Sequence, residues 1–568
     1  MSSKDQDSVE SRLSLDSSES QEVNIVKGYR ARHEDQENNE PAGISLRSYS
    51  NIIISRTSTI AEAIRDDNEY ATKHESRKIE PAPIDDVVLA PLEKTATAIS
   101  AIYDGEFNKE DVISKPPDGT FWGWMCVACV MFVNAFSWGA NSSYGVFLDY
   151  YTKTDHFPGA NNDEFALIGG LNLGLSFMVC NLANTLVRRY PYKIVMSAGI
   201  VLIVICYFVA AEVTTITQLI MVQGLLLSIG YALVAGPSML LIPTWFLEKR
   251  SLANGTTASG AGLAGLIFSR PVQLLIDQTG SFKWALRMIG IVCGAMLVLS
   301  TILMKSRRSL IVNTGLSLWG DIVKNFTRWD IYRQTPMISL ITWNFIYGVA
   351  YTILLFSLSA YSSSIGLSYK QGSMVTTMQS VAQMVGRPAL GYISARYGKA
   401  NVTILFTLFL GIFSLAFWIF VNSYGALIAY GVIAGFIQGV NWVNFTPMCA
   451  DVVGGGDDLV AAVSVLCFVG GPPLIVSEII GLKLERPNSE KPFLYCQILV
   501  GVTCIVSAFV LLPFREWKIW RMFDARRHLI ERKEERSEED EIRLRRYEVL
   551  LERSVRGYLI RSFYPIKT

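Results

Sequence analysis

The chain is poor in charged residues and has almost no histidine. Only 18% of its 568 residues are Asp, Glu, Lys or Arg, and it has 4 histidines. These are His33, His74, His156 and His528, which lie far apart and outside the apolar segments described below. No metal-ligand cluster, phosphate-binding loop or nucleophile–base set stands out in the sequence. We therefore expect no metal, no cofactor, no enzymatic activity and no nucleic-acid partner.

Long apolar segments dominate the sequence instead, and 50% of the residues are hydrophobic. A hydrocarbon core about 30 Å thick needs a helix of roughly 20 apolar residues. Twelve such segments lie between Phe121 and Phe514, which predicts an all-α integral membrane protein embedded in the lipid bilayer. The predicted spans are 121–148, 164–186, 194–211, 217–242, 251–275, 284–304, 336–360, 371–394, 401–421, 424–447, 458–482 and 493–514.

The polar segments divide the chain further. Residues 1–115 are rich in Ser, Asp, Glu and Asn, which predicts a disordered cytoplasmic N-terminal arm. Residues 116–304 and 336–514 are predicted to be two six-helix halves. Residues 305–335 form a predicted cytoplasmic amphipathic linker, and 515–568 a charged cytoplasmic C-terminal helix or tail. Regulation of the arm by a kinase or a ubiquitin ligase is one interpretation, and a solvated tail without that role is the simpler alternative.

Basic residues indicate how the chain is oriented. The linker and the start of the tail are rich in Lys and Arg, which places both termini in the cytoplasm. Among the short loops this bias nearly vanishes, because Lys483, Arg486 and Lys491 fall on the predicted outer side. A weak repeat also relates the halves: Arg189-Tyr190-Pro191 follows span two, and Arg396-Tyr397-Gly398-Lys399 follows span eight.

Three motifs carry a family resemblance. The first is Asp118-Gly119-Thr120-Phe121-Trp122-Gly123-Trp124 at span one. The second runs from Trp245 to Gly255 and continues in the small residues Ser259 to Gly265. The third is Arg387-Pro388 in span eight with Gly391 and the basic turn after it; Gly470-Gly471-Pro472-Pro473 also matches. Over about residues 116–515 the chain resembles the major facilitator superfamily and, within it, the fungal branch of the monocarboxylate porter family.

The resemblance implies roles for particular residues. It implies the fold of two six-helix halves and, because some members of the fungal branch carry riboflavin, a riboflavin-like or monocarboxylate-like solute. The matching signature and gating positions are Asp118, Gly119, Trp124, Lys249, Arg250, Gly255, Gly391, Arg396 and Gly398.

The departures from the family pattern concern proton coupling. Proton-coupled lactate carriers of this family have a lysine in span one and an aspartate four residues before the span-eight arginine. Ser142 and Gln383 occupy those positions here, while Arg387 is retained. Glu478 in span eleven is the remaining buried acid and a candidate for proton coupling. The acidic residue that usually precedes Arg396 is replaced by Ala395.

Polar side chains at helical spacing complete the predicted substrate site. Arg387 is its centre, since an intramembrane cation is costly unless it has a function or a partner; pairing with Glu478 or a backbone carbonyl is the alternative. Spans one, seven and ten line the cavity in the resembled fold. Their candidate substrate-binding residues, with Gln383 of span eight, are Trp138, Asn141, Ser142, Asn344, Tyr347, Asn441 and Trp442. Ordinary hydrogen bonding between helices, worth about 0.6 kcal/mol per contact, is the alternative for each amide.

Together these features predict a membrane transporter of a small organic solute that works by alternating access. Facilitated or only weakly proton-linked transport is favoured because the lysine and aspartate of the lactate carriers are absent. A proton-coupled monocarboxylate symporter is the first alternative, and a nutrient sensor that signals through the N-terminal arm is the second. We expect the plasma membrane as its location, with the vacuolar membrane as the alternative.

Overall fold

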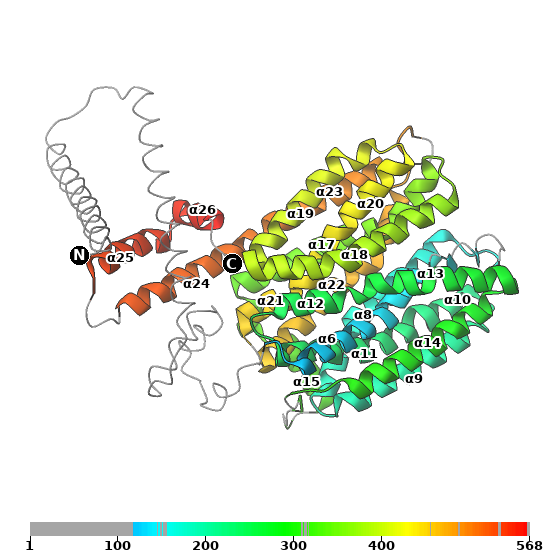
Figure 1. The fold of residues 1–568 in the computed structure, drawn as a ribbon, viewed down its shortest axis with the longest axis horizontal. Coiled ribbons are helices and arrows are strands. Elements are labelled where there is room, and N and C mark those ends of the chain that lie inside the picture. The colour runs from blue at the N-terminus through cyan, green and yellow to red at the C-terminus, as the bar shows by residue number, and fades with distance from the viewer. Residues whose placement is uncertain are drawn as a thin grey trace, which may run out of the picture. The chain divides into compact units, whose positions relative to one another are not determined.

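The computed structural model describes residues 118–564, apart from 145, 148–149, 152–155, 308–309, 312–314, 316, 455, 487–488 and 532–535. The predicted arm of residues 1–115 and its modification sites lie outside this part of the chain. Within the described residues the regular secondary structure is helical throughout, and no strand occurs (Figure 1).

The first half contains six spans, several of which are made of more than one helical piece. They are α6 (Phe121–Phe136) with the 3₁₀ turn η2 (Trp138–Ser143); α8 (Asn162–Val187); α9 (Tyr192–Ala210); α10 (Ile216–Leu219), the π-helical η3 (Ile220–Leu226) and α11 (Leu227–Trp245); α12 (Arg250–Ala258) with α13 (Gly260–Thr279); and α14 (Phe282–Leu303).

The second half contains another six spans. They are α17 (Thr335–Ser364); α18 (Tyr369–Tyr397); α19 (Lys399–Ala416) with η4 (Trp418–Phe420); α20 (Tyr424–Gln438) with α21 (Val440–Val453); α22 (Gly456–Lys483); and α23 (Leu494–Val510), which α24 (Leu512–Glu531) continues. We call the end of the bundle that carries the linker between the halves the linker end, and the opposite end the far end.

Eleven of the described helices are long and apolar enough to cross a membrane. The remaining predicted span, the eighth at 371–394, corresponds to α18, a helix of 29 residues whose hydropathy is lowered by buried Gln379, Gln383 and Arg387. It packs against α12, α13, α17 and α20, so its polar face is covered by protein. This shielding is what allows a helix with a cation in its middle to lie in the bundle.

The prediction of one continuous helix over 121–148 is wrong. The α-helix ends at Phe136, and Ser137 leaves helical geometry with φ −111° and ψ −97°. Gly139 follows in the 3₁₀ turn, where a Cβ would lie 2.4 Å from the Cβ of Ala264. The close approach of α13 therefore requires glycine at this point and brings the irregular backbone of span one against a neighbouring helix.

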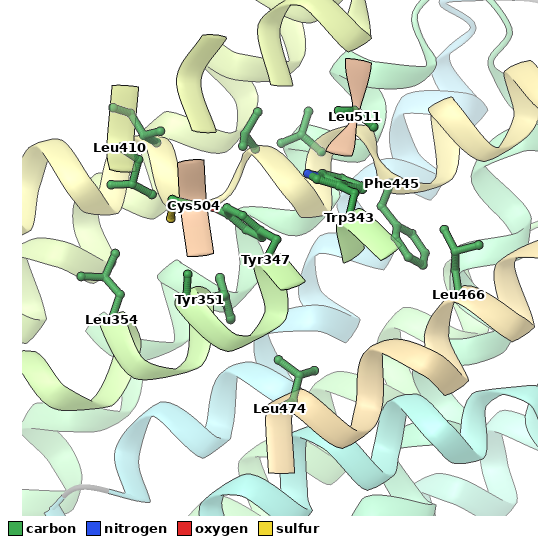
Figure 2. Packing of buried hydrophobic residues seen from close by; sticks show 14 of the residues in the cluster. Trp343, Tyr347, Tyr351, Leu354, Leu410, Phe445, Leu466, Leu474, Cys504 and Leu511 are labelled. Atoms are coloured by element: carbon green, nitrogen blue, oxygen red, sulfur yellow. The ribbon is translucent and has the colours of Figure 1, made fainter. Parts of the chain in front are cut away.

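Each half has its own hydrophobic core. One cluster of buried side chains runs from Cys126 to Met304, within the first half. The other is formed mainly by residues 331–514 and adds only Phe177, Cys180 and Ala232 from the first half. Figure 2 shows part of the second core, where Trp343, Tyr347 and Tyr351 follow one another along α17. Two separate cores allow the halves to move as units.

The linker and the tail are helical where they are described. The linker forms α15 (Leu318–Phe326) and α16 (Trp329–Tyr332), and the tail forms α25 (Glu538–Leu551) and α26 (Val555–Phe563). The predicted boundary at residue 515 is not a break, because α24 runs from the membrane segment into the tail. Arg515 donates from Nη2 to the carbonyl of Tyr564 at 2.5 Å, which holds the end of the tail against α24.

Candidate functional site

The centre of the bundle holds one buried cation, Arg387 of α18, whose side chain is 2% exposed. Its Nη2 donates to Gln383 Oε1 at 2.6 Å and to the hydroxyl of Tyr351 at 3.3 Å. Its Nη1 donates to the backbone carbonyl of Ala258 in the other half. Its Nε is buried and has no hydrogen-bond partner. Of the two structural alternatives, the backbone carbonyl is a partner, whereas no contact with Glu478 is found among the described residues.

Breaks in two helices make room for this cation. The helix of span five is interrupted between α12 and α13, next to Ala258, which accepts from Arg387. The helix of span ten is interrupted at Gly439, where a Cβ would lie 2.5 Å from Arg387 Cγ and 2.8 Å from Nε. Glycine at this position lets the backbone of span ten lie against the guanidinium, and the backbone of span five contacts it at Ala258.

Aromatic rings connect the cation with the first half of the molecule. Trp138 stacks on Phe177 with centroids 4.5 Å apart, and Phe177 stacks on Trp442 at 4.9 Å. Tyr351 meets the edge of Trp442 at 5.4 Å and also accepts from Arg387. The rings come from spans one, two, seven and ten. A flat solute that enters between them would contact both halves.

Amide groups line a cavity next to these rings. The cavity is small, and its lining includes Phe177, Asn344, Asn441 and Trp442. Asn344 Nδ2 donates to the carbonyl of Leu466 at 2.9 Å, and Asn441 Nδ2 donates to Asn344 Oδ1 at 3.4 Å. These bonds fix both amides and leave Asn441 Oδ1 buried without a partner. The cavity therefore presents a free hydrogen-bond acceptor beside an aromatic surface. We call Arg387, Gln383, Tyr351, Trp442, Phe177, Trp138, Asn344 and Asn441 the central site.

Some of the predicted substrate residues lie elsewhere. Tyr347 is fully buried in the core of the second half, where its hydroxyl donates to the carbonyl of Gln438 at 2.8 Å. Asn141 and Ser142 lie on the 3₁₀ turn η2, but their side chains are outside what the structure describes. Asn134 donates to the carbonyl of Thr257 at 2.8 Å and so ties α6 to α12. The central site thus contains Arg387, Gln383, Trp138, Asn344, Asn441 and Trp442 of the predicted set.

The two halves are in contact along α8 and α22. A Cβ on Gly170 would lie 2.4 Å from the carbonyl oxygen of Ile475, and one on Gly174 would lie 2.5 Å from that of Gly471. At the far end Lys483 Nζ lies 3.8 Å from Asp163 Oδ2. At the linker end Arg188 pairs with Asp457. In this arrangement the halves touch on both sides of the central site.

The signature residues are gathered at the linker end. Asp118 accepts backbone N–H groups of Leu247, Glu248 and Lys249, at 2.9, 3.1 and 3.2 Å. Trp124 packs edge-on against Phe246 at 5.2 Å. The acid that the sequence places at the start of span one therefore ties that span to the turn between α11 and α12. Gly119 has φ 111°, which an ordinary residue rarely adopts, and this allows the tight turn beside Lys249.

The basic turn after span eight is held by an acid of another helix. Arg396 is exposed and lies over the ring of Tyr397. Lys399 instead pairs with Asp451 of α21 at 2.6 Å, and Lys518 of α24 binds the other oxygen of the same carboxylate at 2.5 Å. Gly398, with φ 98°, makes the turn that separates α18 from α19. Asp451 thus supplies the carboxylate for this basic turn, and sequence order alone could not indicate the pairing.

Two glycines of the signature motifs bring the halves together. A Cβ on Gly255 would lie 2.3 Å from the carbonyl oxygen of Arg387, and one on Gly391 would lie 2.6 Å from that of Ser251. Arg250, at the start of α12, is 8% exposed and donates to the carbonyl of Phe246 at 3.2 Å. Gly255 and Gly391 are therefore places of helix packing between α12 and α18.

The linker is fastened to both halves. Arg189, after α8, pairs with Asp321 of α15, and Asn325 donates to Asn181 Oδ1 of α8 at 3.1 Å. Arg328 pairs with Asp458 of α22 at 2.8 Å. A hydrogen bond from Arg328 lowers the pKa of Asp330 from its ordinary value. Sequence reasoning missed these partners and missed Phe177, because an apolar residue in an apolar helix carries no signal of a ligand site.

Comparison with known proteins agrees with this architecture. The family model described as Major Facilitator Superfamily matches residues 127–473. Among curated proteins of Saccharomyces cerevisiae, the chain is 29% identical to "Uncharacterized transporter ESBP6" over 88% of this chain and 75% of that protein. It is 30% identical to "Probable transporter MCH2" over 60% of this chain and 70% of that protein. It is also 24% identical to "Fujikurins efflux protein" of Gibberella fujikuroi, over 71% and 84% of the two chains.

Among solved structures, the fucose:proton symporter of Escherichia coli superposes with a TM-score of 0.49 at 15% identity. The match covers 69% of this chain and 97% of that one.

Proposed function

Because the chain belongs to the major facilitator superfamily, we propose that it carries a small planar organic solute through the central site by alternating access. The observation that carries the proposal is the continuous row of Trp138, Phe177 and Trp442, which joins the two halves beside Arg387. A solute bound there touches both halves, so their relative movement exposes it to one side of the membrane and then to the other.

The chemistry of the site favours a heteroaromatic solute of the riboflavin kind. Stacked rings offer flat apolar surface, and each aromatic pair contributes about 0.5–1.5 kcal/mol beyond its buried area. Asn441 Oδ1 offers an acceptor for an N–H or O–H of the solute, and Arg387 Nε offers a donor. A ring system with polar groups at its edge would use the aromatic surface, the Asn441 acceptor and the Arg387 donor together. We further propose that the linker end faces the cytoplasm of the plasma membrane and that the site exchanges solute without an obligatory proton.

A monocarboxylate is the second candidate, and one observation favours it. Arg387 is a buried cation with an unpartnered Nε, and a carboxylate is the anion that a guanidinium recognises best. On this proposal the solute would bind mainly through Arg387 and would contact the rings only weakly. The two candidates therefore differ in how strongly binding depends on Trp442.

Transport into cells that lack endogenous carriers tests these proposals. Labelled riboflavin and a panel of labelled monocarboxylates are offered at about pH 5 and about pH 7.5, with and without a protonophore. Saturable movement of one planar solute, unchanged by the protonophore and lost in Arg387→Ala, is the expected result. Carboxylate uptake that collapses with the protonophore would refute the facilitator proposal. Efflux from preloaded cells is measured in parallel, because one relative is named as an efflux protein.

A further inference from the structure

Glu478 lies outside the central site, in the contact between the two halves near the far end. It follows Gly471 and Ile475 at helical spacing, on the stripe of α22 that packs against α8. A Cβ on Gly169 of α8 would lie 3.5 Å from Glu478 Oε2 and 3.7 Å from the ring of Tyr144. Oε2 is buried and has no hydrogen-bond partner. The side chain is half-buried between two packed helices, and its buried oxygen has no compensating donor.

The charged groups on the neighbouring elements have other partners or lie at the linker end. On α8, Asp163 lies near Lys483, and Glu164 accepts the backbone N–H of Asn161 at 2.9 Å. Tyr144, on the segment after η2, donates to the carbonyl of Phe165 at 3.1 Å. α17 faces this part of α22 with Ile353 and Ser357 near Gly481. The other neighbours of α22 carry their charged groups at the linker end: Asp321, Lys324, Arg328, Asp330 and Asp451.

A carboxylate in such a place is unfavourable, since burial of an unpaired charge costs far more than burial of the neutral acid. The packed arrangement of α8 and α22 therefore favours neutral Glu478. When the far end opens, these helices separate and water can solvate the charged form. Protonation and closure of the far end are thus thermodynamically linked.

We propose that Glu478 is a proton-sensitive group of the far-end gate: the neutral acid lets α8 and α22 close over the solute, and the carboxylate keeps them apart. This rests on the proposed transport function and on the proposed orientation, in which the far end faces the outside. When the protein opens at the linker end during the transport cycle, the α8–α22 contact at the far end stays closed. The proton on Glu478 therefore returns to the outside, and external pH changes the rate of transport without driving accumulation.

Thiol labelling at the gate tests the inference without knowledge of the solute. Ile475→Cys places a thiol in the α8–α22 contact, and a membrane-impermeant maleimide is added from outside at external pH from about 5 to about 8. Labelling is divided by that of Thr214→Cys, an exposed position at the far end, which corrects for the pH dependence of thiol reactivity. The unsubstituted chain gives the background from the nine native cysteines, which are buried.

We expect the normalised labelling of Ile475→Cys to rise about fivefold or more with pH, within the usual range of coupling between two sites. In combination with Glu478→Gln, which is neutral at every pH, labelling should stay at the low-pH level. Glu212→Gln removes an exposed far-end carboxylate that pairs with Lys283 and Arg287, and should leave the response unchanged. A pH response that persists in Glu478→Gln would refute the inference.

Transport provides the second readout. With the cytoplasmic pH held constant, uptake should rise as external pH falls, and uptake by Glu478→Gln should be independent of external pH. Solute accumulation that is abolished both by a protonophore and by Glu478→Gln would overturn the inference in favour of proton symport. Absence of any solute movement would contradict the proposed function alone, because the labelling experiment still decides the role of Glu478.

Discussion

Arg387 of α18 donates to the backbone carbonyl of Ala258, and this hydrogen bond crosses from one half of the protein to the other. The same guanidinium is held within its own half by Gln383 and Tyr351. If the halves separate at this point, the bond to Ala258 breaks and its donor becomes available to a solute. The central cation would then hold the halves together in the empty protein and bind solute when they part.

The first prediction concerns the charge and shape of Arg387. Arg387→Gln should lower uptake about tenfold or more, because hydrogen bonds to a charged group are worth about 1.5–3 kcal/mol each. Arg387→Lys should recover little, since an ammonium cannot reproduce the guanidinium fork. Initial rates are normalised to the amount of protein at the cell surface. Arg270→Gln, at an exposed position of α13, is the control, and wild-type rates in Arg387→Gln would contradict the assignment.

The second prediction separates the two solute classes. Trp442→Ala removes the indole on which a planar solute is proposed to stack, and should raise KM for that solute by up to about tenfold, since one aromatic pair contributes about 0.5–1.5 kcal/mol. KM for a small carboxylate should change far less. The exposed Trp284→Ala is the control for loss of an indole. Equal effects of Trp442→Ala on both solutes would remove the case for stacking.

Much of the fold could be predicted from the sequence because the bilayer sets a strong length requirement. Twelve apolar segments predicted the helices, including α18, whose hydropathy is lowered by buried Gln379, Gln383 and Arg387. The break after Phe136 was missed, since apolar composition does not report local geometry. Just after the break Gly139 lies against Ala264, which is a tertiary interaction.

The central site could be predicted only in part. Four of its residues were found because polar or charged groups inside a membrane segment usually have a partner or a function. They are Arg387, Asn344, Asn441 and Trp442. Tyr347 was placed with them by helical spacing, but its hydroxyl serves the core of the second half. Phe177 was missed because its role depends on stacking between two tryptophans from other spans. The role of Asp451 could not be read from the sequence, because its lysine partners are distant in sequence.

The third prediction is an asymmetry in the ion pair of Arg188 and Asp457. The Arg188 side chain is 5% exposed, whereas that of Asp457 is 45% exposed. Asp457→Asn leaves a buried cation without its partner and should destabilise by up to about 3 kcal/mol. Arg188→Gln leaves an exposed carboxylate and should cost less than about 1 kcal/mol. Thermal unfolding of the purified protein in detergent shows which substitution is more destabilising. Equal decreases in Tm would contradict the prediction.

The fourth prediction concerns the acid that joins α19, α21 and α24. Asp451→Asn leaves both Lys399 and Lys518 without their carboxylate, and should lower Tm more than Lys518→Met, which leaves the pair of Asp451 and Lys399 intact. The matched control is Asp277→Asn, since Asp277 is exposed and bonds only to Gln273 of its own helix turn. If Asp451→Asn behaved like Asp277→Asn, the three helices would not depend on this carboxylate.

The last prediction tests whether the broken helix of span ten positions the cation. Gly439→Ala would place a Cβ 2.5 Å from Arg387 Cγ, so the guanidinium must shift away from Gln383 and Ala258. Uptake should fall about tenfold while the protein still reaches the membrane, because the added methyl group disturbs one side chain rather than a whole helix contact. Gly425→Ala is the control, since no atom lies within 4 Å of the added Cβ there. Full activity in Gly439→Ala would mean that transport does not need Arg387 in this position, and the cation would then serve the packing of the halves alone.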